Sequence, residues 1–196
     1  MEIKIAGIEI KAPTLRVLIR LGITAAFVIL IVALVLRPRT APEPQEQWKR
    51  IIPGVTTQEE VKSLLGEPDK TETINGVLVL YYTSTSPYFT DEIFIGSDNK
   101  VEFIRERIIG RSDISLQTYL NNLGNYIRLY GPDSESSGIF LYVSPERGAA
   151  YLGNPINDLT EQIWYFQPSS IENLLQKTYF AEYSLTEILK PADGVE

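Results

Sequence analysis

Cysteine and histidine are both absent from the 196 residues of this chain. Their absence excludes disulfide bonds, thiol nucleophiles, Cys/His zinc sites, Ser-His-Asp triads and haem ligation through imidazole. The phosphate-binding motifs GxxxxGK[ST] and GxGxxG are absent as well. Most familiar catalytic constellations are therefore excluded, and neither a metal nor a cofactor is expected.

What is present is enough apolar sequence for a core, together with an uneven charge. Hydrophobic residues make up 44% of the chain and charged residues 22%. Residues 1–39 carry six basic and two acidic side chains, which leaves 12 basic and 23 acidic for residues 40–196, a net charge of −11. Such an acidic surface repels phosphate backbones, so nucleic acid is not an expected partner.

A long apolar run stands near the N-terminus. Residues 17–36 contain Arg20 as their only charged residue, and twenty helical residues span about 30 Å, the thickness of a bilayer's hydrocarbon core. The run predicts a transmembrane helix that contacts membrane lipid and serves as a signal anchor. A buried core helix and the apolar region of a cleaved signal peptide are the alternatives, and Arg39 and Pro42 around Ala41 disfavour cleavage.

Basic residues around this run predict its orientation. Four precede or begin it and two directly follow it, which places the N-terminus in the cytoplasm by the positive-inside rule. The expectation is a single-pass bacterial membrane protein whose globular part is extracytoplasmic, in the periplasm or at the cell surface. Residues 1–16 are expected to be cytoplasmic or interfacial, or else a short strand or frayed terminus. Residues 37–50 are rich in proline and predict an extended linker.

Residues 51–168 contain the same order of expected helix and strands twice, as in a tandem repeat. In residues 51–111, Thr57 and Glu60 form a capping box before the apolar residues Val61, Leu64 and Leu65. Strands are expected at 77–84, 91–97 and 100–108. In residues 112–168, helical spacing runs from Leu116 toward the Gly131-Pro132 turn, and strands are expected at 138–144, 148–154 and 160–167.

The predicted fold class is α+β. It consists of an N-terminal single transmembrane helix, two tandem helix-plus-antiparallel-meander repeats and short C-terminal helices. The C-terminal segment, residues 169–196, is expected to hold two short helices, one capped by Ser169 and the other by Ser184.

The first unit resembles the SmpA/OmlA family of small envelope proteins that take part in outer-membrane β-barrel assembly. The resemblance covers about residues 51–108 and is carried by PGVTTQEEVKSLLGEPD, Tyr81-Tyr82 and KVEFI, with matches at Pro53-Gly54, Thr57, Val61, Leu65-Gly66 and Pro68. It implies a helix-then-antiparallel-sheet fold like that of the tandem-repeat β-lactamase inhibitor proteins, an extracytoplasmic location, and protein contact instead of catalysis. Family members are lipoproteins held by an N-terminal cysteine, whereas this chain has no cysteine.

Two groups of side chains stand out as candidate functional residues. The acidic clusters Glu59-Glu60, Asp91-Glu92 and Asp133-Ser134-Glu135 are expected to be solvated faces and not metal or acid–base sites. The strand aromatics are too numerous for one side of a thin core, because neighbouring strand residues point to opposite faces. The aromatic residues predicted to bind a protein partner are Trp164, Tyr82 and Tyr142, with Tyr165 and Tyr81 as the alternatives of opposite parity.

These features predict a membrane-anchored extracytoplasmic protein–protein interaction module that is not an enzyme. It is expected to be an envelope assembly factor or an accessory subunit of a larger membrane protein complex. The alternative is a small-ligand-binding protein or an enzyme that uses the sheet face, which a closed pocket with a buried carboxylate favours.

Overall fold

The computed structural model describes residues 46–85, 88–108, 115–132 and 134–186, and the backbone of residues 3–5 and 8–10. The chain divides into two units, Met1–Pro42 and Glu43–Glu196. In the first unit, β1 (Ile3–Ile5) pairs with β2 (Ile8–Ile10) as an antiparallel two-stranded sheet. The alternating isoleucines at the N-terminus thus lie on strands that pair with each other.

The predicted single-pass membrane topology needs correction. None of the helices in the described stretches is long and apolar enough to cross a membrane. The predicted transmembrane helix, residues 17–36, lies outside those stretches. The transmembrane and signal-anchor assignments and the extracytoplasmic location are therefore withdrawn, whereas lipid contact through residues 17–36 stays a prediction.

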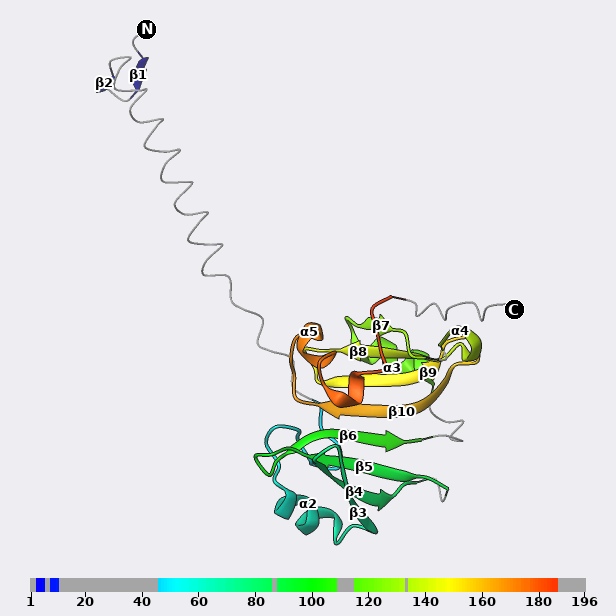
Figure 1. Cartoon of the computed structure of the whole chain (residues 1–196). Helices are drawn as coiled ribbons and strands as arrows, with labels where there is room; N and C mark the ends of the chain where they lie inside the picture. Colours follow the sequence, from blue (N-terminus) through cyan, green and yellow to red (C-terminus); the bar gives the residue numbers. More distant parts are fainter. Residues whose placement is uncertain are drawn as a thin grey trace. The chain divides into compact units, whose positions relative to one another are not determined.

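The second unit is built on one antiparallel sheet of eight strands (Figure 1). Its strands are β3 (Lys70–Ile74), β4 (Val77–Thr83), β5 (Thr90–Ile95), β6 (Val101–Arg107), β7 (Ile127–Leu129), β8 (Phe140–Ser144), β9 (Ala149–Asn154) and β10 (Leu159–Phe166). The spatial order is β3-β4-β5-β6-β10-β9-β8-β7. Strands β3 to β6 and β7 to β10 each form a meander, and the last strands of the two meanders, β6 and β10, pair at the centre.

This topology corrects the predicted fold of two helix-plus-meander repeats. All eight strands belong to one sheet, because β6 and β10 are hydrogen-bonded neighbours. Each half of the sheet also contains four strands where three were expected, since β3 and β7 were not predicted. The boundaries proposed for the segments 51–111, 112–168 and 169–196 stay predictions.

Short helices flank the sheet: α2 (Gln58–Leu65), α3 (Leu116–Leu123), α4 (Ser134–Ser137), α5 (Ile171–Leu174) and the 3-10 helix η1 (Thr178–Phe180). The capping box predicted for α2 is confirmed, because the Glu60 amide donates to Thr57 Oγ1 and the Thr57 amide donates to the Glu60 carboxylate. The cap of α5 is Ser170 and not Ser169. Ser184 forms a β-bridge with Tyr130 where a helix cap was expected.

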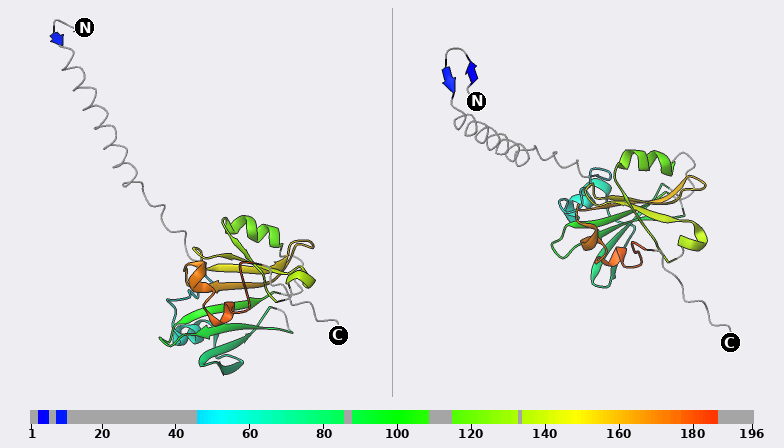
Figure 2. Two further views of the ribbon diagram at one scale, coloured as in Figure 1. Left: turned by 45° about the horizontal axis from the view of Figure 1, so that its top comes forward. Right: turned by 90° about the horizontal axis from the view of Figure 1, so that it is seen from above.

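The two faces of the sheet carry different covers. Helices α2 and α3 pack on one face, here called the helix face, through Val61 and Leu120. Residues 171–183, here called the strap, pack on the opposite face through Leu174 and Phe180. Figure 2 shows α3 and the orange strap on opposite sides of the sheet. We call the second face the strap face.

Candidate functional site

The strap face carries a row of eight side chains, one from each strand, that changes from polar to apolar. Each of these residues lies directly opposite the next one on the neighbouring strand; in the spatial order of the strands they are Lys70, Tyr81, Glu92, Arg105, Trp164, Ala150, Val143 and Ile127. The strap packs on the apolar part, from Trp164 onward. The polar part, on β3 to β6, lies beside the strap.

A charge network occupies the polar part of the row. Glu92 is only 13% exposed, and its two carboxylate oxygens accept from Arg105 Nη1 at 3.0 Å and from Arg107 Nη2 at 3.2 Å. Closer to the sheet edge, Glu72 accepts from Lys70 at 2.8 Å and from the Tyr81 hydroxyl at 3.0 Å. Lys70 and Tyr81 hold the pKa of Glu72 below its usual value. Both carboxylates are therefore satisfied by cations.

Arg105 connects this network to the aromatic core. The centre of its guanidinium lies 5.9 Å from the Phe94 ring, 5.7 Å from the Phe103 ring and 5.3 Å from the Trp164 ring. Burial lowers the pKa of Arg105, while the charge of Glu92 opposes that shift. Among the described residues, no acceptor pairs with its buried Nε. Arg105 thus retains a hydrogen-bond donor that the described part of the chain does not use.

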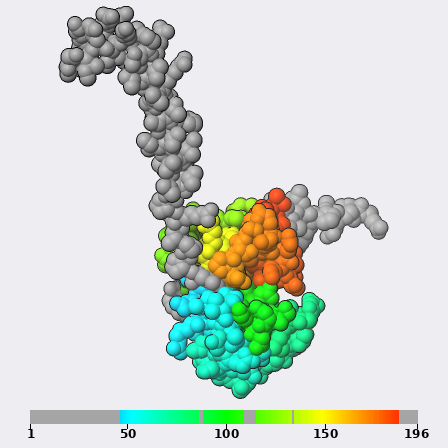
Figure 3. Space-filling view, turned by 90° about the vertical axis from the view of Figure 1, so that its left-hand side faces the viewer, coloured from blue at the N-terminus to red at the C-terminus, as the bar shows by residue number. Residues whose placement is uncertain are grey.

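A recess of about 410 Å³ opens beside this network, between the sheet and the strap. We call it the strap groove; in Figure 3 it lies between the orange strap and the blue-green β3–β4 hairpin. Its lining consists of Ile74, Val77, Glu92, Phe94, Glu102, Arg105, Gln176, Lys177, Thr178 and Tyr179. Apolar, aromatic and charged groups therefore meet in one concave surface.

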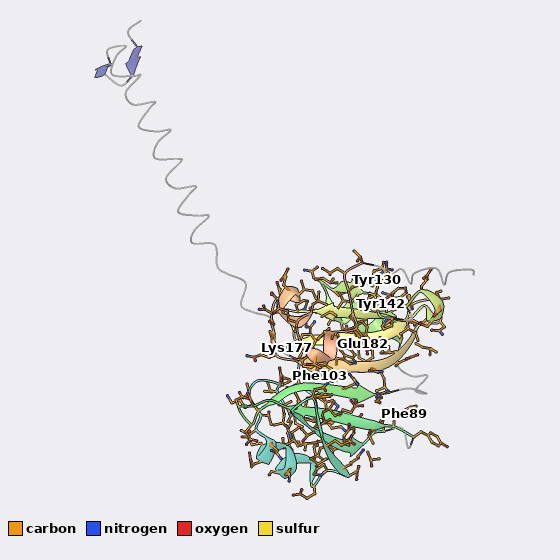
Figure 4. The ribbon with its side chains drawn as sticks, in the orientation of Figure 1. Phe89, Phe103, Tyr130, Tyr142, Lys177 and Glu182 are labelled. Atoms are coloured by element: carbon orange, nitrogen blue, oxygen red, sulfur yellow. The ribbon has the colours of Figure 1, made fainter. Side chains whose placement is uncertain are left out.

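The strap wall of this groove is fixed to β6 by two contacts. The Tyr179 ring stacks on Phe103 with a centroid distance of 4.1 Å and an interplanar angle of 9°. Lys177 Nζ donates to Glu102 Oε1 at 2.6 Å. Figure 4 labels Lys177 and Glu182 on the strap and Phe103 on β6. Because both ends of these contacts line or border the groove, the strap and the sheet together define its width.

A second polar group, on the helix face, corrects the expectation that Asp91-Glu92 is solvated. Asp91 is 1% exposed, accepts from the Arg107 amide at 3.0 Å and pairs with Lys49 at 3.4 Å. The Tyr165 hydroxyl donates to Glu106 at 3.1 Å. Burial raises the pKa of both Asp91 and Glu106. In the described stretches, three or more acidic side chains nowhere gather in a way that could hold a metal ion.

The predicted aromatic anchors do not share one exposed face. Trp164 and Tyr81 lie on the strap face, whereas Tyr82, Tyr142 and Tyr165 lie on the helix face. Trp164, Tyr82 and Tyr142 are only 2%, 7% and 4% exposed, so the expectation that they form an outward aromatic surface is corrected. Tyr81 and Tyr165 are partly buried. Contact of these residues with a partner stays a prediction.

The residues that form the groove floor carried a signal in the sequence. Glu92 and Phe94 alternate with the buried residues Ile93 and Ile95, as strand residues of one face do. Phe103, Arg105 and Arg107 share the same period of two on β6. Opposite charges at these positions pointed to a cross-strand network, which sequence reasoning did not identify.

Comparison with known proteins gives little beyond this geometry. No family model matches the sequence, and no curated protein matches it either. Two solved structures are similar at 12% identity: a DUF4309 family protein from Bacillus subtilis, with a TM-score of 0.45 over 62% of this chain and 86% of that one, and an extracellular protein containing a SCP domain from Bacillus anthracis, with a TM-score of 0.39 over 71% of this chain and 51% of that one. Neither likeness assigns a fold family or an activity. The resemblance to the SmpA/OmlA family stays a prediction.

Proposed function

We propose that this chain is a protein–protein interaction module, and that the strap groove receives an extended segment of its partner. The strap groove carries this proposal, because it combines three apolar side chains and the Tyr179 ring with charged groups in a recess of about 410 Å³. Interfaces of proteins use such a mixture of aromatic anchors and arginine. The predicted resemblance to small assembly proteins points to the same class of function.

The chemistry of the groove favours binding over catalysis. Glu92 is held by two arginines and Glu102 by Lys177, so each carboxylate already has a cationic hydrogen-bond partner. A general base needs a carboxylate that is free to take a proton from substrate. That the protein is not an enzyme stays a prediction.

Arg105 gives the proposed partner one chemical requirement. Arg105 and Lys177 place positive charge in the groove lining beside the apolar side chains of Phe94 and Val77. A carboxylate of a bound segment fits these cations, and an adjacent apolar side chain fits Phe94 and Val77. The partner segment is therefore expected to carry Asp or Glu next to an apolar residue.

A small ligand is the second candidate, and one observation favours it. Small-molecule sites commonly measure roughly 300–1,000 Å³, and the strap groove lies within that range. A small carboxylic acid meets the same requirement at Arg105 as an acidic peptide.

Affinity capture with the full chain, followed by mass spectrometry, tests the proposal. Thr178 is exposed on the strap and lines the groove, so Thr178→Trp should fill the groove and abolish capture of the specific partner. Leu185→Trp adds an indole at another exposed position outside the groove and should leave capture intact. Equal capture by both variants contradicts the groove as the protein-binding site. Loss of a co-purifying small acid, without any captured protein, favours the second candidate.

A further inference from the structure

Strand β3 forms an open edge of the eight-stranded sheet. Among the described residues it pairs only with β4, and four of its five residues are exposed. At the opposite edge, the end of β7 is extended by the bridge between Tyr130 and Ser184. An exposed strand edge offers backbone donors and acceptors to another strand. We propose that two copies of this chain pair edge to edge through β3, in antiparallel orientation.

The side chains of β3 select one register for this pairing. Lys70, Glu72 and Ile74 lie on the strap face, since they oppose Tyr81, Val79 and Val77, and Thr71 and Thr73 lie on the helix face. Residues directly opposite each other in an antiparallel pair share a face. The two-fold axis of a symmetric pair therefore passes midway between one residue and the same residue of the other copy.

Only one position of this axis places opposite charges together. With the axis at Thr71, Lys70 of each copy lies opposite Glu72 of the other, and the two Thr71 residues face each other. With the axis at Lys70 or Glu72, like charges lie opposite each other, which destabilises a strand pair. With the axis at Thr73, Glu72 faces the apolar Ile74. The sequence Lys70-Thr71-Glu72 is thus self-complementary when read antiparallel.

Contacts within one copy already hold these charges at the edge. Lys70 Nζ lies 2.8 Å from Glu72 Oε1, and the two side chains are 60% and 44% exposed. The Tyr81 hydroxyl donates to the other oxygen of Glu72, and Lys70 Nζ lies 5.3 Å from the centre of the Tyr81 ring. Both charged groups are therefore arranged on the strap face before pairing, which lowers the entropic cost of association.

The charges also explain why the edge does not pair indiscriminately. Charged side chains on an edge strand repel or fail to match most other strands. Alternating signs leave one favourable register with an identical strand. The axis is normal to the sheet, so the pair presents both strap grooves on the same side. Pairing through β3 does not depend on what the strap groove binds.

The absence of cysteine makes a direct crosslinking test possible in the full chain. Facing residues of an antiparallel pair have Cα atoms about 4.5–5.5 Å apart, a separation that permits a disulfide bond. Thr71→Cys should therefore form a disulfide-linked dimer under mild oxidation. Thr73→Cys is the matched control, because the proposed register offsets its two copies by four residues, about 13 Å, beyond the reach of a disulfide. Equal or absent crosslinking at the two positions overturns the proposal.

Charge exchange gives an independent test by sedimentation of the full chain. Lys70→Glu alone places two carboxylates opposite each other at both ends of the pair, and Glu72→Lys alone does the same with two ammonium groups. Each variant should therefore weaken dimerisation by about tenfold or more. A mixture of the two variants restores opposite charges at both positions and should form a heterodimer. If the mixture stays as monomeric as each variant alone, or if the wild-type chain is monomeric throughout, β3 is not a self-pairing edge.

Discussion

Arg105 and Trp164 face each other across the seam where the two meanders join. They are register partners on β6 and β10, and the guanidinium carbon lies 5.3 Å from the Trp164 ring centre. On one side of this pair the strap face is charged and borders the strap groove. On the other side it is apolar and lies under the strap. The pair therefore marks the boundary between the proposed binding surface and the core.

Trp164 is expected to act as a core residue. It is almost fully buried and packs edge-on against Phe103 and Phe180. Trp164→Ala should lower the free energy of unfolding by about 3–5 kcal/mol because it creates a large cavity. Val55→Ala, at an exposed position, should change it by less than about 0.5 kcal/mol. Urea denaturation followed by circular dichroism measures both, and similar small values for the two variants contradict this placement.

The Glu92 network is expected to contribute more to folding stability than the ion pair between Glu72 and Lys70 at the sheet edge. Glu92→Gln leaves Arg105 and Arg107 without their charged acceptor in a largely buried place, and should cost about 1–3 kcal/mol of stability. Glu72→Gln makes the same chemical change in the more exposed pair with Lys70, where the loss of stability should be smaller than for Glu92→Gln because solvent screens the pair. Denaturant unfolding of both variants at pH 7 tests the order. Equal losses indicate that burial does not strengthen the network.

Local sequence signals account for much of the fold. The α2 capping box depends on Thr57 and Glu60 alone, so a short pattern sufficed to predict it. The turn at Asn75-Gly76, where both residues have positive φ, is a strong hairpin signal before β4. This signal favours a strand before the turn, which is β3, although β3 is not among the strands predicted from the sequence. Gly124, also at positive φ, ends α3 before β7, whereas the helical spacing had been continued past it.

The candidate site depends on contacts that no local pattern contains. The groove wall exists because the strap folds back onto Phe103, far from it in sequence. Asp91 is buried because Lys49 and the Arg107 amide lie over it, although its position at a strand start suggested solvent. Strand parity predicts that Glu92 and Phe94 share a face. Which face the strap covers follows only from tertiary packing.

Glu106 is expected to make stability depend on pH. Burial raises its pKa, with Asp91 adding repulsion and Tyr165 and Lys49 opposing the shift. A raised pKa in the folded state means that the stabilising contribution is complete below the unfolded value, about 4.3, and is lost as the pH rises through the folded value. Glu106→Gln should therefore gain stability relative to wild type as the pH rises from about 4 to about 8.

Glu72→Gln supplies a control of opposite sign for this titration. The pKa of Glu72 is lowered by Lys70 and Tyr81, so its contribution is present above the unfolded value and lost as the pH falls. Relative to wild type, Glu72→Gln should lose stability as the pH rises toward about 4.3, and the difference should stay level at higher pH. Thermal or urea unfolding at several pH values measures both differences. A difference for Glu106→Gln that stays constant with pH contradicts the burial effect.

Phe180 and Lys177 hold the strap, and therefore the groove wall, on the sheet through different kinds of contact. Phe180 is fully buried and contacts Trp164 and Phe166 edge-on at centroid distances of 5.3 and 5.5 Å. Lys177 instead makes a partly exposed ion pair with Glu102. Phe180→Ala should lower the free energy of unfolding by about 3–5 kcal/mol, whereas Lys177→Ala should cost less than about 1 kcal/mol.

Hydrogen exchange distinguishes loosening of the strap from destabilisation of the whole sheet. Because Phe180 contacts the central strand β10 through Trp164 and Phe166, the Phe180→Ala variant should lose protection in β10 as well as in the strap. Lys177→Ala should leave protection in β10 unchanged, since its ion pair reaches only the Glu102 side chain. If Phe180→Ala loses protection in the strap alone, the strap is a separable cover of the groove and not part of the core.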